Sequence, residues 1–243
     1  MTKNLAELQD SLNDWPNRRV SRIEPVEWHC VFKLPFEVEY LRESLIYRLF
    51  ELIDAGLKLL KNQNLLGSVI CSRSAQETIA ALSYIDELID HSLRQQEVTH
   101  LREMSHRLMF GAHNSDPGVE KINILTLIKK IDRRLPGFEK HYFALSEYAH
   151  PNWSGTMGLF AQTGGQEVRV DFGRYIRGSS AISIHIEVAL LNTMSIFELV
   201  EEEYPPLAKA LIELCDNLHD KSELLTQIKH PPISQIKPRP GQA

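Results

Sequence analysis

The sequence predicts a mostly α protein, a multi-helix bundle with one small β-hairpin insertion. Leucines recur at spacings of three, four and seven residues over 36–62, which predicts an amphipathic helix. A second long helical pattern covers 65–93, and so short a connection between long helices predicts an antiparallel hairpin of helices. The segment 158–172 alternates with period two around a Gly-Gly pair, a pattern typical of a β-hairpin.

The remaining helical patterns are shorter and are bounded by glycine or proline. Pro205 fits the first turn of a final helix, because proline is favoured at that position. These patterns predict helices over 96–110, 119–135, 138–150, 179–204 and 205–228.

The chain is predicted to have three parts. Residues 1–35 form an N-terminal arm with a short helix over 5–13, and the arm packs on the body through Trp28 and Phe32. Residues 36–229 form the helical bundle. Residues 230–243 are rich in proline, which predicts a disordered tail.

Composition and charge bound the function classes. The 243 residues are 43% hydrophobic and 24% charged, as in ordinary soluble globular proteins, and the net charge of −5 disfavours a surface devoted to nucleic-acid backbone. The cysteines Cys30, Cys71 and Cys215 lie far apart, which indicates a reducing compartment and neither a disulfide framework nor a zinc site. No apolar leader or run of membrane-spanning length is evident, so we expect a cytoplasmic protein without membrane association.

Two pairs of polar residues sit on apolar helices. Arg73 and Glu77 lie one turn apart, and so do Ser146 and His150, just before the helix-ending Pro151. One interpretation is a surface ion pair between Arg73 and Glu77, which contributes about 0.2–0.5 kcal/mol. The other is a buried cluster, because small neighbours let a second helix approach and bring Ser146 and His150 to Arg73. Such a cluster can be catalytic or purely structural.

Arg107 and His113 have an Arg-x5-His spacing. An arginine can hold a phosphate and a histidine can move a proton near neutral pH, which together suffice for metal-free RNA cleavage through the 2′-hydroxyl. Six positions place the two side chains about 120° apart on a regular helix, so Gly111 would have to bend the chain. The simpler alternative is a helix end with a histidine near its carbonyl terminus.

Three further arginines, Arg169, Arg174 and Arg177, lie near Trp153 and Tyr175. They can form a cationic, aromatic surface that binds RNA or another anion, or they can simply cover the hairpin. Three Glu-x-x-His pairs fit poorly to the four-helix geometry of a di-metal centre, since two of them share one helix. We therefore predict no metal site and no cofactor.

Two motifs carry a family resemblance. The Arg-x3-Glu helix at 71–78 and the Ser-x3-His-Pro motif at 145–151, followed by a short hairpin, resemble a group of uncharacterised bacterial helical proteins. These proteins resemble HEPN-type bundles, which occur in toxin–antitoxin and anti-phage systems. Active HEPN nucleases carry Arg-x4–6-His and form their site across a dimer. The resemblance therefore implies catalytic roles for Arg107 and His113, although Leu108 stands where a polar residue is usual.

Two functions remain open. The first is a metal-independent endoribonuclease of HEPN type, in which Arg107 or Arg73 stabilises phosphate charge and His113 or His150 is the general acid–base. The second is a non-catalytic interaction or scaffold protein with a protein partner and a structural network of Arg73, Glu77, Ser146 and His150. A homodimer is expected in either case, because the long helices leave more than one apolar face.

Overall fold

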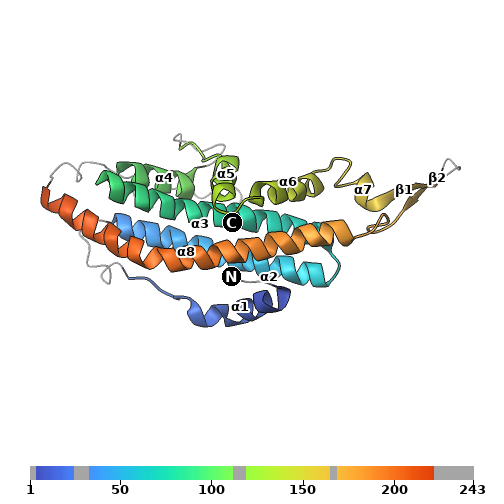
Figure 1. Ribbon diagram of the computed structural model, residues 1–243, viewed down its shortest axis with the longest axis horizontal. Coiled ribbons are helices and arrows are strands. Elements are labelled where there is room, and N and C mark those ends of the chain that lie inside the picture. Colours follow the sequence, from blue (N-terminus) through green and yellow to red (C-terminus); the bar gives the residue numbers. More distant parts are fainter. Residues whose placement is uncertain (1–3, 25–32, 112–118, 165–168, 222–243) are drawn as a thin grey trace, which may run out of the picture.

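The computed structural model describes residues 4–24, 33–111, 119–164 and 169–221, which form an elongated helical bundle with one two-stranded hairpin (Figure 1). The mostly α prediction is confirmed. Three long helices run along the bundle: α2 (Leu34–Lys61), α3 (Leu65–Gln95) and α8 (Ser180–Lys221). Shorter elements surround them: α1 (Leu5–Arg18), α4 (Thr99–Phe110), α5 (Ile124–Arg134), α6 (Phe138–Ala149), α7 (Met157–Phe160), β1 (Ala161–Gly164) and β2 (Arg169–Phe172).

Helices α2 and α3 form the expected antiparallel hairpin. The connection is tight because Gln63 adopts a left-handed conformation, with φ of 56°, and the Asn64 side chain caps α3 by accepting from the Gly67 N–H at 3.2 Å. Their facing stripes are fully buried together with that of α8. The core of this layer includes Ile46, Ile53, Leu57, Ile79, Leu82, Ile186 and Leu190.

Helices α4, α5 and α6 cover α3 on the side away from α1 (Figure 1). The turn between α5 and α6 needs Gly137, whose φ is 97°. The Asp132 carboxylate accepts from the backbone N–H groups of Gly137 and Glu139 at 3.0 Å each, which satisfies the start of α6. Phe138, Tyr142 and Leu145 then face the core.

Helix α1 is longer than the sequence predicted. It continues past 5–13 through Trp15 and Pro16, so the expected stop before Pro16 is wrong. The reason is packing, since the Trp15 ring stacks on Phe50 with ring centres 3.3 Å apart, and Leu8 is fully buried. Pro16 lies in the last turn, so the helix loses one backbone hydrogen bond, to the Leu12 carbonyl, close to where it ends. Trp28 and Phe32 of the predicted arm, and the predicted tail over 230–243, lie outside the described residues.

Helix α8 is one continuous helix where the sequence predicted two. It passes through Pro205 and Pro206, which lie on its exposed side, and Figure 1 shows it curving toward its C-terminal end. Tyr204 before the prolines, and Leu211 and Leu214 after them, lie on the same buried stripe. Burial of that stripe offsets the lost backbone hydrogen bonds, which water can replace on the exposed side.

The same helix bears on the membrane prediction. By length and composition alone, α8 contains a stretch that is apolar enough to cross a membrane, and 44% of that stretch is buried in the bundle. The expectation that no run reaches such a length is therefore wrong by this criterion. A core helix of a bundle gives the same signal, because it is apolar on most of its faces.

The hairpin starts later than the sequence predicted. Residues over 158–160 belong to the helical turn α7, because the Gly158 N–H donates to the Trp153 carbonyl at 2.6 Å and closes a turn there. Strands β1 and β2 pair antiparallel, with Ala161 opposite Phe172. Of the predicted turn over 163–166, Thr163 and Gly164 are the last residues of β1, and 165–166 lie outside the described residues.

The packing of α1 gives a testable prediction. Trp15→Ala should lower the free energy of unfolding by about 2–3 kcal/mol, somewhat less than for a fully buried aromatic ring, because Trp15 is only partly buried. Urea denaturation followed by circular dichroism measures the change. Asp10→Ala, at an exposed position of the same helix, is the control and should change stability little. Equal effects of the two variants would show that α1 is not held by this stack.

Candidate functional site

A polar network joins α3 to α6 around Arg73. Its Nε donates to the Ser146 Oγ at 3.0 Å, and its Nη2 donates to the Tyr142 hydroxyl at 3.0 Å. The same Nη2 lies 3.0 Å from the Glu77 carboxylate. The Tyr142 hydroxyl donates to Glu77 at 2.8 Å, so the four side chains form one connected set.

The sequence predicted part of this network. The structure brings Arg73, Glu77 and Ser146 together across two helices. Tyr142 was missed, although it lies one turn before Ser146 and a buried tyrosine hydroxyl usually needs a partner. Burial and the hydrogen bond to Glu77 raise the pKa of Tyr142, so its hydroxyl stays a proton donor.

His150 does not join the network, which corrects the predicted cluster. The helix ends at Ala149, and His150 takes an extended backbone with φ of −83° and ψ of 148° ahead of Pro151. Its backbone N–H donates to the Ser146 carbonyl at 3.1 Å, but its side chain is exposed. The contacts described for Arg73, Glu77, Tyr142 and Ser146 are made with one another and do not include the imidazole.

The chemistry of this network is that of a structural contact. The Glu77 carboxylate is already engaged, because it accepts a hydrogen bond from Tyr142 and pairs with Arg73. The Ser146 hydroxyl uses its hydrogen on the Tyr142 carbonyl at 2.9 Å and accepts from Arg73, so it is not poised as a nucleophile. The set fixes the register of α6 on α3.

The second predicted pair, Arg107 and His113, is only half described. Arg107 lies in the last turn of α4 and donates through its Nε to the Glu120 carbonyl at 2.9 Å. Its Nη2 lies 3.4 Å from the Glu120 carboxylate and 3.5 Å from the Lys121 carbonyl. Arg107 therefore ties the end of α4 to residues 120–121. His113 lies outside the described residues, so its relation to Arg107 stays a prediction.

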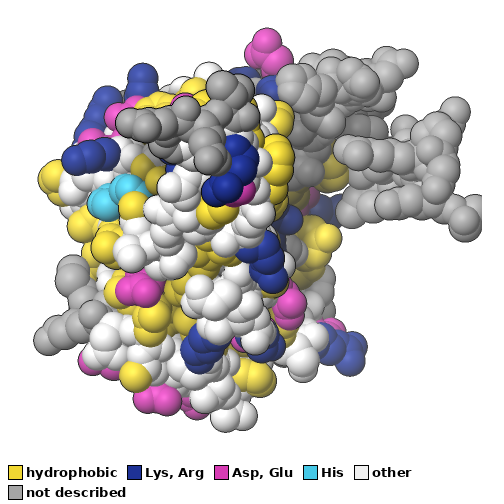
Figure 2. Space-filling model, turned by 90° about the vertical axis from the view of Figure 1, so that its right-hand side faces the viewer, with side chains coloured by type: hydrophobic (Ala, Val, Ile, Leu, Met, Phe, Trp, Pro, Cys, Tyr) yellow, Lys and Arg dark blue, Asp and Glu magenta, His cyan; other side chains and the backbone are white. Residues whose placement is uncertain are grey.

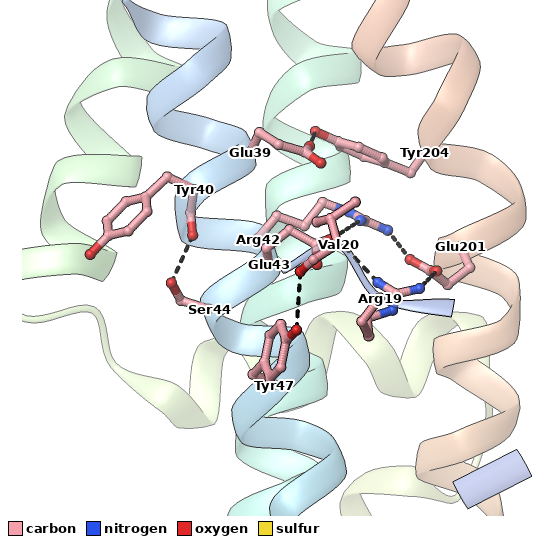
Figure 3. A network of polar contacts seen from close by, with 10 residues as sticks. All are labelled: Arg19, Val20, Glu39, Tyr40, Arg42, Glu43, Ser44, Tyr47, Glu201 and Tyr204. Carbon is pink, nitrogen blue, oxygen red and sulfur yellow. Dashed lines mark hydrogen bonds and ion pairs between the residues drawn. The ribbon is translucent and has the colours of Figure 1, made fainter. Parts of the chain in front are cut away.

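A second polar network, which the sequence did not predict, lies between α2 and α8 (Figure 3). The buried Arg42 forms ion pairs with Glu201 and, at 3.5 Å, with Glu43, and its guanidinium lies 3.7 Å from the centre of the Tyr204 ring. Arg19 follows α1 and bridges the same two carboxylates, at 3.2 Å from Glu43 and 2.6 Å from Glu201. Ion pairs of Arg19 therefore attach the end of α1 to both α2 and α8.

Two carboxyl groups complete this buried region. Tyr204 donates its hydroxyl to Glu39 of α2 (Figure 3). Asp86 of α3 is only 3% exposed, and neither carboxylate oxygen has a hydrogen-bond partner among the described residues. Burial also raises the pKa of Glu43, against the opposing charge of Arg19. The sequence carried a sign of this buried network, because Arg42 and Asp86 occupy positions in the apolar stripes of their helices.

An apolar groove lies at the hairpin end of the bundle, with a volume of about 450 Å³. Its walls come from three separate parts of the chain: Leu66 of α3, Tyr148 and His150 at the end of α6, and Met157, Phe160 and Phe172 of α7 and the hairpin. Figure 2 views this end of the molecule, where hydrophobic side chains reach the surface among charged ones.

Large apolar side chains around this groove are unusually exposed. Phe172 is 79% exposed, Trp153 57% and Met157 56%, and Val170 is close to half exposed. Several large exposed apolar side chains beside an apolar groove are typical of a binding site, whereas single exposed hydrophobic residues are ordinary.

The three arginines predicted to bind RNA or another anion are exposed around the hairpin. Arg177 donates to the Ala161 carbonyl at 2.8 Å and lies 5.4 Å from the Trp153 ring centre. Arg174 donates to the Gln63 carbonyl at 3.1 Å, and Arg169 pairs with Asp171 at 3.2 Å. These contacts match the simpler interpretation, that the arginines cover the hairpin, and binding of RNA stays a prediction.

The described residues bring together no group of three or more histidine, cysteine or acidic side chains that could hold a metal ion. The sequence matches no family model and no curated protein, and the structure matches no solved structure. The resemblance to HEPN-type bundles therefore stays a prediction. What the structure defines is a class, an α-helical bundle with an apolar groove at one end and two internal polar networks.

The role of the Arg73 network can be tested by removing one hydroxyl. Tyr142→Phe should lower the free energy of unfolding by about 1–2 kcal/mol, because Arg73 and Glu77 each lose a partner while the packing volume stays. His150→Ala, at an exposed position, should change it by less than about 0.5 kcal/mol. Urea denaturation of the three chains measures both. A large loss in His150→Ala would contradict this account and restore His150 to the network.

Proposed function

We propose that the protein is a non-catalytic interaction module that binds an apolar segment of a partner protein at the hairpin end of the bundle. The observation that carries the proposal is the groove next to the exposed side chains of Trp153, Met157 and Phe172. Leaving such large apolar groups in water is unfavourable, by about 25 cal/mol per Å² of apolar surface, and a partner that covers them recovers that free energy.

The outer edges of the hairpin offer backbone hydrogen-bonding groups to the same partner. Strands β1 and β2 are four residues each, and the described part of the chain contributes two strands to this sheet, so each has an outer edge. An extended segment can pair with such an edge and place alternate side chains in the neighbouring groove. We therefore favour an extended apolar segment as the ligand.

The polar networks support a binding function over a catalytic one. Glu77 and Ser146 are already engaged within the Arg73 network, and Arg107 is engaged with residues 120–121. A HEPN-type ribonuclease in a toxin or defence system remains the competing prediction, because His113 lies outside the described residues.

The groove is tested by a surface substitution with a matched control. Phe172→Ser should abolish partner binding and leave the melting temperature unchanged, since Phe172 is mostly in solvent. Tyr40→Ser is the control, because Tyr40 is also a well-exposed aromatic residue but lies near the start of α2, away from the groove-lining residues. Proteins captured from the cell of origin by wild type and Tyr40→Ser, but not by Phe172→Ser, are the candidates.

Binding must then be reproduced with the purified candidate by calorimetry. We expect Phe172→Ser to weaken it by a factor of ten or more, that is by at least about 1.4 kcal/mol. If Phe172→Ser and Tyr40→Ser bind equally well, the hairpin end is not the binding surface.

The competing nuclease is tested by RNA cleavage in EDTA. We expect purified wild-type protein to cleave RNA no faster than Arg107→Ala, His113→Ala or His150→Ala, because Glu77, Ser146 and Arg107 are already engaged in contacts within the protein. Gel electrophoresis of labelled RNA measures cleavage. Activity in the wild type that disappears in one variant with an unchanged melting temperature would overturn the binding proposal in favour of a metal-independent nuclease.

A further inference from the structure

The strongest unexplained feature outside the groove is the carboxyl group of Asp86. It lies on the buried stripe of α3 between Leu82 and Ile89, which are themselves buried. Both of its oxygens are shielded from solvent, and no described residue donates a hydrogen bond to either. An ionised carboxylate in such a place has lost its water and gained no donors, which is costly.

Charged groups face Asp86 from three neighbouring helices, but each is committed elsewhere. Arg42 of α2 is bonded to Glu201 and Glu43. Arg134 of α5 donates to both carboxylate oxygens of Glu203 at 2.7 Å and to the Ser83 hydroxyl at 3.2 Å.

The other groups near this junction do not relieve Asp86. Glu201 and Glu203 of α8 act on it as like charges. Glu103 and Arg107 of α4 act on Tyr84, and Arg73 and Glu77, earlier on α3, pair with one another.

The charge balance of this junction is unequal. Carboxyl groups outnumber guanidinium groups, because Glu39, Glu43, Asp86, Glu201 and Glu203 face Arg19, Arg42 and Arg134. Full ionisation would leave the junction with two more negative charges than positive ones. Protonation relieves this excess most easily at Asp86, since it receives no hydrogen bond. Burial raises the pKa of Asp86 to about 7, against the opposing charge of Arg42.

We infer that Asp86 is a proton-binding site of the native protein, and that its ionisation above neutral pH weakens the junction of α2, α3 and α8. The direction of the pH dependence of stability follows from the different proton affinities of Asp86 in the folded and the unfolded chain. In the unfolded chain the carboxyl ionises near its ordinary value of 3.8, so at intermediate pH only the folded chain holds this proton. The stabilisation is present in acid and is lost as the pH rises through about 7.

The protonation state of Asp86 also affects contacts outside α3. Arg42 contacts Glu43 and Glu201, and these two carboxylates also hold Arg19 at the end of α1. A third negative charge near Arg42, on an ionised Asp86, competes with those contacts. The junction is therefore a device that can loosen the attachment of α1 and the C-terminal half of α8 within the physiological pH range.

The experiment compares melting temperatures at pH 6 and pH 8.5 for wild type, Asp86→Asn and Asp90→Asn. We expect the wild-type melting temperature to fall by about 4 °C relative to Asp86→Asn over this interval, because asparagine is similar in shape and stays neutral. Asp90→Asn, one turn later at a half-exposed ion pair with Arg94, should keep the wild-type fall. Histidines titrate in all three proteins over this interval, so their contribution cancels when the three changes in melting temperature are compared.

A second measurement keeps the inference testable if Asp86→Asn does not fold. In wild-type protein labelled with ¹³C at the aspartate carboxyls, one aspartate should titrate near pH 7, and Asp86→Glu should remove that resonance. If every aspartate titrates below pH 5, or if Asp86→Asn retains the wild-type pH dependence, the inference is wrong.

Discussion

The packing of α3 against α2 and α8 is the interaction on which the other features depend. Helix α3 is apolar on most of its surface and is covered on several sides, by α2, α8, α4, α5 and α6. A helix of this kind cannot be stable in water alone, so its neighbours exist to bury it. Both polar networks and one wall of the groove involve residues of α3, from Leu66 through Arg73 and Glu77 to Asp86.

The two polar regions on α3 show what burial demands of charged groups. Around Arg73 the guanidinium, carboxylate and hydroxyls satisfy one another, so the network fixes α6 against α3 with little electrostatic penalty. Around Arg42 the pairing is incomplete, because carboxyl groups are in excess and Asp86 has no donor. A satisfied network stabilises a register, whereas an unsatisfied one stays sensitive to protons.

The proposed binding surface follows from how the bundle ends. The groove is closed by the tip of α6, the turn α7 and the hairpin, and these small elements have little core of their own. Their apolar side chains are consequently split between the groove and solvent, as Phe172 shows. The same shortage of cover leaves these side chains available to the proposed partner, whereas the long helices behind them bury theirs in the core.

The sequence by itself determined the helices and the hairpin, because their periodic apolar patterns reflect which face each element must bury. It also placed Arg73, Glu77 and Ser146 on faces that could meet. Only the tertiary structure decided where these rules give way to packing. Helix α1 runs through Pro16 because Trp15 stacks on Phe50, and α8 passes through Pro205 and Pro206 because its buried stripe continues beyond them. The structure also places the His150 side chain in solvent just past the end of α6, outside the Arg73 network. Asp86 is buried because the helices around it outweigh the cost of one carboxyl group, a balance that no local pattern contains.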